Sequence, residues 1–278
     1  MTRKASESLP LSREGIAAYE RGDLALAEER LAEARELNDA DVETCRYYGE
    51  TLWKRGKRAE ALDVLRDAAD KYGPVEAQVS IYSSLGEKAL EFGRPEQTIA
   101  WANKTIDLSP KSGVGWRLRG KAYRALDRPK DALDDFLRAA RFDVDDREIL
   151  REIALAQNEL GDYDSALASW QYLEGLYPTN REPAEVFAGK GSAYAGLGLL
   201  VDAQEAYEVA VRSAPSDPDL RVRLAEVALA RGDYARAAAL ASEALALAPE
   251  NPAALALYRA TRDPAQIAEN PNVDKRFR

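Results

Sequence analysis

The residue best suited to nucleophilic chemistry in this chain is Cys45, the single cysteine among its 278 residues. A cysteine attacks as the thiolate and needs a neighbouring base or positive charge to form it. The usual base is missing, because the sequence contains no histidine. The positions that correspond to Cys45 in related segments carry large apolar residues: Leu11, Tyr82, Trp116, Leu150 and Phe187. We therefore predict that Cys45 is a buried packing residue.

A glycine-rich stretch and several carboxylate pairs are the other patterns that could do chemistry. Residues 189–198 read GKGSAYAGLG, but a Walker loop needs serine or threonine directly after its lysine, where this stretch has Gly191. The carboxylate pairs fall on helix faces or turns that the sequence predicts to be solvated. These pairs are Glu28–Glu29, Asp134–Asp135 and Asp145–Asp146. We therefore predict neither a nucleotide site nor catalytic carboxylates.

The composition indicates a globular protein without a cofactor. Hydrophobic residues make up 46% of the chain and charged residues 31%. The net charge of −9 disfavours nonspecific binding to nucleic acid. One cysteine and no histidine exclude an intrachain disulfide and a cysteine-based zinc site. No apolar run reaches the ~18 residues of a membrane span and no secretory signal is visible, so we expect a cytoplasmic protein. Because no nucleophile, base and orienting group come together in the sequence, we also expect no catalytic residues, no metal and no cofactor.

Three series of small residues recur along the chain with the same spacing. The first series is Gly15, Gly49, Gly86, Gly120, Ala154, Gly191 and Ala225. The second is Gly22, Gly56, Gly93, Asp127, Gly161, Gly198 and Gly232. The third is Ala27, Ala61, Thr98, Ala132, Ala166, Ala203 and Ala237. In each series the separations are 34, 37, 34, 34, 37 and 34 residues, so the chain repeats a unit of 34 residues seven times.

Each unit reads as two helices joined by a tight turn. In the fifth unit, Leu150, Ile153 and Ala154 recur at three- and four-residue spacing, which is typical of a helix. The dipeptide Gly161–Asp162 interrupts this pattern, and Ala166 resumes it. Prolines that cannot continue a helix follow four of the second helices: Pro110, Pro178, Pro215 and Pro249. No stretch shows sustained strand alternation, so we predict an all-α fold.

This pattern resembles the tetratricopeptide repeat, which has small residues at positions eight, twenty and twenty-seven of a 34-residue unit and proline at position thirty-two. Seven copies fit the ranges 8–41, 42–75, 79–112, 113–146, 147–180, 184–217 and 218–251. The resemblance implies a right-handed α–α superhelix, a solenoid of seven helix hairpins. Residues 1–7 are expected to form an N-terminal tail, residues 252–262 a capping helix and residues 263–278 a C-terminal tail.

Three extra residues precede the third unit and three more precede the sixth, near Glu76–Gln78 and Arg181–Pro183. Pro74 and Pro183 suit the first position of a helix. We predict that the first helix of the third unit gains about one turn, or ~4.5 Å. Before the sixth unit we expect a longer loop instead.

The resemblance also implies that five positions of each first helix line a concave groove that binds partners. The partner-binding residues carried over in this way are Arg46, Glu50, Trp53, Leu90, Arg117, Lys121, Arg124, Arg151, Leu155 and Asn158. Arg117, Lys121 and Arg124 share one helix face, because they stand at i, i+4 and i+7.

Two interpretations of these basic residues remain open. With Arg46 and Arg151 they could form an anion-binding strip in the groove. They could also form internal salt bridges with acidic residues of adjacent helices, namely Glu87, Glu91, Glu148 and Glu152.

The resemblance implies a non-enzymatic scaffold that binds a partner protein or peptide, with acidic groups of the partner facing the basic strip. A receptor for acidic chaperone tails is disfavoured, because the family's clamp needs asparagine where this chain has Glu50, Glu87 and Lys121. One alternative is a module that assembles with itself or with an envelope or secretion complex. Another is an RNA-binding helical repeat, against which the acidic net charge argues. The oligomeric state stays unknown.

Overall fold

The computed structural model describes residues 3–37, 41–69, 74–179 and 181–261. These residues form fifteen α-helices and no strand, which confirms the all-α class. The chain divides into two compact units, Met1–Arg128 (unit 1) and Pro129–Arg278 (unit 2). Unit 1 contains α1 (Arg3–Glu20), α2 (Leu24–Leu37), α3 (Val42–Lys54), α4 (Arg58–Ala69), α5 (Val75–Glu91), α6 (Pro95–Leu108) and α7 (Gly113–Ala125). Unit 2 contains α8 (Pro129–Ala139), α9 (Arg147–Glu159), α10 (Tyr163–Gly175), α11 (Ala184–Gly196), α12 (Leu200–Ser213), α13 (Pro218–Ala230), α14 (Tyr234–Leu247) and α15 (Pro252–Ala260).

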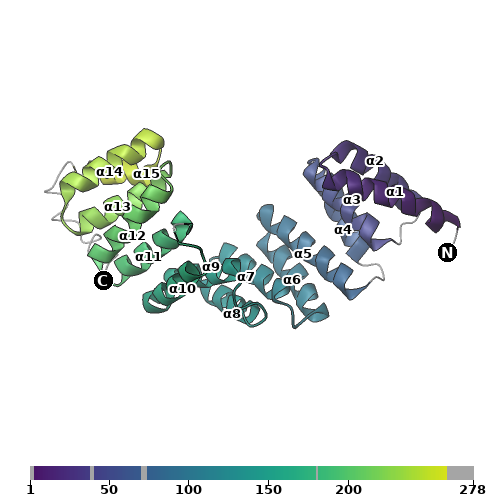
Figure 1. The fold of residues 1–278 in the computed structure, drawn as a ribbon, viewed down its shortest axis with the longest axis horizontal. Coiled ribbons are helices and arrows are strands. Elements are labelled where there is room, and N and C mark those ends of the chain that lie inside the picture. The colour runs from purple at the N-terminus through teal and green to yellow at the C-terminus, as the bar shows by residue number, and fades with distance from the viewer. Residues whose placement is uncertain (1–2, 38–40, 70–73, 180, 262–278) are drawn as a thin grey trace. The chain divides into compact units, whose positions relative to one another are not determined.

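Successive helices pair as hairpins within each unit (Figure 1). The hairpins are α1–α2, α3–α4 and α5–α6 in unit 1, and α9–α10, α11–α12 and α13–α14 in unit 2. The second helix of each hairpin also packs against the first helix that follows it. Within each unit, packing therefore joins helices that are one or two places apart along the chain. The division between the units falls inside the predicted repeat 113–146, so α7 belongs to unit 1 and α8 to unit 2.

Small residues bring the two helices of a hairpin close together. A Cβ atom on Gly49 of α3 would lie 2.5 Å from Leu65 Cγ of α4, closer than such atoms can approach. The facing Ala61 is fully buried. Gly191 of α11 makes the same kind of contact, since an added Cβ would lie 2.9 Å from the ring of Tyr207. The small residues of the repeat thus mark helix–helix contacts.

The turns between paired helices use glycine in the left-handed region, where only glycine adopts the conformation without strain. The glycines with positive φ, between 66° and 81°, are Gly22, Gly56, Gly93, Gly161, Gly198 and Gly232. After Gly161, the Asp162 side chain accepts a hydrogen bond from the backbone N–H of Ser165 and so caps α10. The dipeptide Gly161–Asp162 therefore consists of a turn residue followed by a helix cap.

Asp127 occupies this turn position after α7 with φ of 56° and is the single non-glycine residue with positive φ in the described part of the chain. Its N–H donates to Arg124 O at 3.0 Å, and the next N–H, of Arg128, donates to Tyr123 O at 3.0 Å. Left-handed backbone is strained for any residue with a Cβ atom.

We expect Asp127→Gly to raise the free energy of unfolding by about 0.5–1 kcal/mol in urea denaturation, and Asp127→Ala to lower it. A glycine variant less stable than the original chain would contradict this account.

Two sequence predictions about helix ends need correction. The predicted tail 1–7 is helical from Arg3 onward, because helix-forming residues extend α1 and because Ser8 is buried, which anchors that turn. Pro74 and Pro183 lie one position earlier than predicted, at the N-caps of α5 and α11. Residues 1 and 2 lie outside the described residues.

The three extra residues before the third unit and the three before the sixth unit have the predicted effects on the helices. Helix α5 has 17 residues, whereas the first helices α3, α7, α9, α11 and α13 each have 13. The extra helical turn of the third unit is thereby confirmed. Residues 181–183, before the sixth unit, lie outside any helix.

The last described helix, α15, packs against α13 and α14. Its Ala254 is fully buried beside Val222 and Ala244. The helix ends at Ala260, and the predicted tail 263–278 lies outside the described residues, as does residue 262 of the predicted capping helix.

Candidate functional site

The first helices of unit 1 lie next to one another, because α1 packs against α3, α3 against α5, and α5 against α7. Between α5 and α7 there is an open cavity of about 360 Å³. Its walls are Ser83, Glu87, Leu90 and Glu91 from α5 and Val114, Arg117, Leu118 and Lys121 from α7. We call this cavity the α5–α7 groove. It brings together three of the predicted site residues: Leu90, Arg117 and Lys121.

The α5–α7 groove has walls of opposite charge. Helix α5 contributes Glu87 and Glu91, which stand at i and i+4 on one face, and α7 contributes Arg117 and Lys121 at the same spacing. Arg124 follows Lys121 by one turn but does not line the cavity. Arg117, Lys121 and Arg124 each also take part in contacts within the chain. The groove is therefore a mixed-charge site whose lining also includes apolar residues, and the basic residues Arg117 and Lys121 form one of its two walls.

Glu50 of α3 belongs to an internal polar cluster with Ser84 and Lys88 of α5. Lys88 Nζ donates to Glu50 Oε2 at 2.7 Å and to Ser84 Oγ at 2.9 Å, while Ser84 Oγ donates to Glu50 Oε1. Only 8% of the Lys88 side chain and 18% of the Glu50 side chain are exposed. A serine beside a lysine can act as nucleophile and base. Here the lysine nitrogen is a donor in both contacts and the serine proton points to Glu50, so the cluster is an internal ion pair.

Trp53 and Arg46 of α3 make contacts with neighbouring side chains. The Trp53 ring meets the Phe92 ring edge-on with centroids 5.2 Å apart, and Lys88 Nζ lies 5.2 Å from the Trp53 ring centre. The Arg46 guanidinium lies 4.1 Å from the centre of the Tyr47 ring. Neither residue lines the α5–α7 groove.

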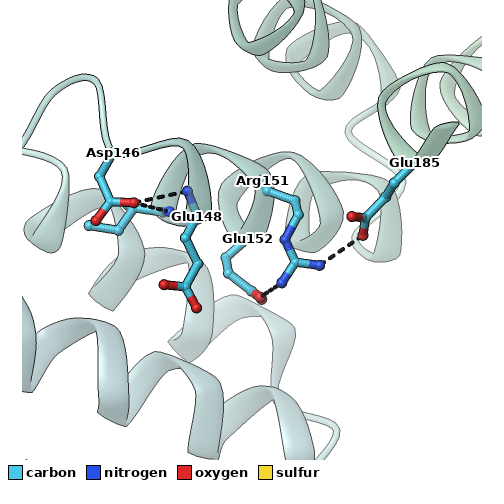
Figure 2. Close-up of polar contacts among 6 residues, drawn as sticks. Asp146, Glu148, Arg151, Glu152 and Glu185 are labelled. Carbon is cyan, nitrogen blue, oxygen red and sulfur yellow. Dashed lines mark hydrogen bonds and ion pairs between the residues drawn. The ribbon is translucent and has the colours of Figure 1, made fainter. Parts of the chain in front are cut away.

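Arg151, the predicted basic residue of unit 2, forms ion pairs within the chain (Figure 2). Its guanidinium donates to Glu152 Oε1 at 2.6 Å and to Glu185 Oε1 of α11 at 2.7 Å. Burial by itself lowers the pKa of Arg151, but the hydrogen bond to Glu185 and the nearby carboxylates outweigh it and raise that pKa above its ordinary value. For Arg151, the interpretation as an internal salt bridge therefore holds.

The helix that carries Arg151 is fixed at its start by Asp146. The Asp146 carboxylate accepts from the backbone N–H groups of Glu148, at 2.9 Å, and Ile149, at 3.2 Å (Figure 2). This cap satisfies donors that the first turn leaves open. Asp146 therefore has a structural role.

The other two predicted residues of unit 2 lie on the same helix. Leu155 packs against the hydrophobic cluster around Trp170. Asn158 Nδ2 donates to Gly189 O of α11 at 3.1 Å. Both residues hold α9 against its neighbours.

A second, smaller cavity of about 200 Å³ lies in unit 2, and sequence reasoning did not identify it as a site. Its walls are Tyr163, Ser192, Ala195, Gly196, Tyr207, Arg223, Glu226 and Val227. Arg223 Nη1 donates to Glu226 Oε2 at 3.2 Å. Burial raises the pKa of Tyr207 to about 12, although a hydrogen bond with Ser192 acts in the opposite direction. The signal that could have located this cavity is the row of small residues on α11: Ser192, Ala195 and Gly196.

The candidates for chemistry in the sequence have packing or capping roles. Cys45 is 1% exposed and packs with Leu65 and Ile81, as predicted. Within the glycine-rich stretch, Gly189 lies against the indole of Trp170, and Lys190 Nζ donates to Glu174 Oε2 at 2.8 Å.

The carboxylate pairs differ in one respect from the prediction. Asp135 is only 3% exposed, so its predicted solvation is wrong. The reason is its position on the face of α8 that also carries the buried Ala132 and Phe136. Asp145 accepts a hydrogen bond from the Tyr172 hydroxyl at 2.8 Å.

Comparison with known families identifies the repeat. The family profile described as "Tetratricopeptide repeat" matches residues 49–113, 117–181 and 189–252, which together exceed half of the chain. The chain belongs to the tetratricopeptide repeat family. The fold of this family is typically that of a non-enzymatic scaffold for protein–protein interaction.

Individual relatives agree with this assignment. The chain is 33% identical over 98 residues to the N-terminal acetyltransferase A complex auxiliary subunit NAA15 of Arabidopsis thaliana. That match covers 35% of this chain and only 11% of the relative. The tetratricopeptide repeat chain is thus similar to a small part of a much longer protein.

Solved structures share the fold. A tetratricopeptide repeat protein from Parabacteroides merdae matches with a TM-score of 0.67 at 20% identity, over 94% of this chain and all of that one. The C-terminal part of a repeat protein from Cytophaga hutchinsonii matches with a TM-score of 0.68 at 16% identity, over 88% and 98% of the two chains. YrrB, described as having an unusual peptide-binding site, matches with a TM-score of 0.53 at 18% identity, over 64% and 91%.

The described residues contain neither a membrane-spanning helix nor a cluster of metal ligands. No helix there is long and apolar enough to span a bilayer. Among the same residues, no three His, Cys, Asp or Glu side chains are grouped so that they could hold a metal ion.

Proposed function

We propose that this tetratricopeptide repeat protein is a non-enzymatic scaffold that binds a peptide segment of a partner protein at the first helices of unit 1, with the α5–α7 groove as the anchoring point. The observation that carries the proposal is the convergence of Leu90, Arg117 and Lys121 on one open cavity. Apolar contact and charge are the two features that peptide-binding grooves combine.

The groove is large enough to hold only a few side chains of the partner. A volume of about 360 Å³ is near the lower end for ligand sites. A whole helix, with a diameter of ~10–12 Å, is too wide for the space between two packed helices. We therefore expect an extended segment and micromolar affinity, about −8 kcal/mol.

Acidic groups of the partner would pair with Arg117 and Lys121 on the α7 wall. Such contacts are partly exposed, so binding should weaken with increasing salt. The peptide-binding description of YrrB lends support by analogy of fold alone. The absence of catalysis is part of the proposal, and the donor role of Lys88 toward Ser84 and Glu50 supports it.

Charge reversal on α7 tests this function. We expect the variant Arg117→Glu, Lys121→Glu, Arg124→Glu to lose the partners that the original chain captures from its native cells, by about tenfold or more in quantitative mass spectrometry. The matched control reverses three exposed lysines outside the groove, Lys104, Lys111 and Lys130, and changes the net charge equally. Partners that bind the α7 variant as well as the original chain, or that are lost from both variants alike, would contradict the proposal.

A further inference from the structure

The α5–α7 groove carries its acidic residues on α5 and its basic residues on α7. Glu87 and Lys121 occupy the same position in successive repeats, so they face the groove from opposite walls at one level. Glu91 extends the acidic wall by one turn toward the C-terminal end of α5, and Arg117 extends the basic wall by one turn toward the N-terminal end of α7. The apolar residues Leu90, Val114 and Leu118 contribute to the same cavity.

A ligand whose charges all have the same sign fits this arrangement poorly. A segment with carboxylates on both sides of its apolar residue would meet Glu87 and Glu91 on the α5 wall, where like charges repel. A segment with two cations would meet Arg117 and Lys121 in the same way. A segment with one carboxylate and one cation satisfies both walls at once.

We infer that the α5–α7 groove selects an extended peptide in which one apolar residue is flanked by an acidic residue on one side and a basic residue on the other. The apolar residue lies over Leu90, Val114 and Leu118, the carboxylate faces α7 and the cation faces α5. This inference rests on the proposed function and names the chemistry of the partner at that site.

The charged walls also determine in which direction the peptide binds. Reversing the order of acid and base in the peptide is equivalent to reversing its direction across the groove. Because the backbone and the apolar residue bind in one preferred direction, the two orders have different affinities. Arg117 and Lys121 already have contacts within the chain, so the peptide replaces existing contacts and the discrimination is moderate.

A peptide array tests the inference. Each peptide carries leucine with one variable position on each side, filled by aspartate, lysine or serine, in all nine combinations. On the full chain we expect the favoured mixed-charge order to bind about fivefold more tightly than peptides with two like charges. The reverse order should bind less tightly than the favoured one.

A composition-preserving swap provides the decisive variant. Exchanging Glu87→Lys with Lys121→Glu leaves the net charge unchanged and places one acid and one base on each wall, so it should abolish the preference between the two mixed orders. The control exchanges Glu28→Lys with Lys57→Glu, an ion pair outside the groove whose Nζ–Oε1 distance is 2.7 Å, and should leave the preference as it was. The fourfold swap that adds Glu91→Lys and Arg117→Glu exchanges the charges of the two walls completely and should invert the preference. Circular dichroism verifies that all the variants are folded.

The outcomes separate this inference from the proposed function. Preferential binding of mixed-charge peptides, with loss of the preference in the double swap and its inversion in the fourfold swap, supports it. Binding without a mixed-charge preference, or with the same preferred order in the fourfold swap, overturns the inference and leaves peptide binding in place. No binding of any peptide to the original chain overturns both.

Discussion

Replacing Lys88 by methionine should lower the free energy of unfolding of unit 1 by about 3 kcal/mol, the scale for removing one partner of a buried ion pair. The substitution keeps the length of the side chain but leaves the Glu50 carboxylate with only Ser84 as a donor among the contacts of this cluster. Water cannot compensate fully, because the side chains of Lys88 and Glu50 are 8% and 18% exposed. Urea denaturation followed by the fluorescence of Trp53, Trp101 and Trp116, which all lie in unit 1, measures the loss.

A matched ion pair elsewhere in unit 1 is the control. Lys57 Nζ also lies 2.7 Å from a carboxylate, Glu28 Oε1, but 46% of the Lys57 side chain is exposed. Arg55 remains 3.0 Å from Glu28 Oε2 after Lys57→Met. We expect this control to lower the free energy of unfolding much less than Lys88→Met does, because solvent screens the exposed pair. Equal losses for the two lysines would show that the burial of the Glu50–Lys88 pair contributes nothing.

Gly189→Ala should destabilise unit 2 by about 1–3 kcal/mol, although alanine is normally the better helix residue. The new Cβ would lie 2.1 Å from Trp170 Cε2, and the indole is completely buried, so it has no free space into which to move. The packing of α10 against α11 would have to loosen. Urea denaturation followed by circular dichroism measures the change.

Gly175 provides the comparison for this substitution. It is an exposed helical residue of α10, and an added Cβ would meet nothing within 4 Å. Gly175→Ala should therefore stabilise unit 2 by about 0.5–1 kcal/mol through helix propensity alone. Opposite signs at the two glycines isolate the contact with Trp170, and a gain at Gly189 would refute it.

The hairpins could be predicted from the sequence because a turn and a close helix contact each demand one small residue. The series through Gly161 marks left-handed turns, and the series through Gly49 and Gly191 marks contacts with Leu65 and Tyr207. Even Asp127, the exception in the turn series, adopts the left-handed conformation. These features depend on the backbone, which repeats with the sequence.

The charged contacts could be predicted only in part. Leu90, Arg117 and Lys121, chosen by their position within the repeat, line one cavity in the structure. Position within the repeat did not reveal that Glu50 is bound to Lys88 or that Arg151 is bound to Glu185. A long charged side chain can contact any of several neighbouring residues. Which one it contacts depends on the distances between them and on their burial, and both differ from one repeat to the next.

The short range of the packing has a consequence for how the protein is made. Within each unit, the main packing contacts among the described helices join partners one or two places apart along the chain, so these contacts can form without waiting for a distant segment. Chains with such low contact order fold quickly. Each hairpin can therefore begin to dock on its predecessor while the ribosome is still adding later ones, which limits the time during which apolar helix faces are exposed to aggregation.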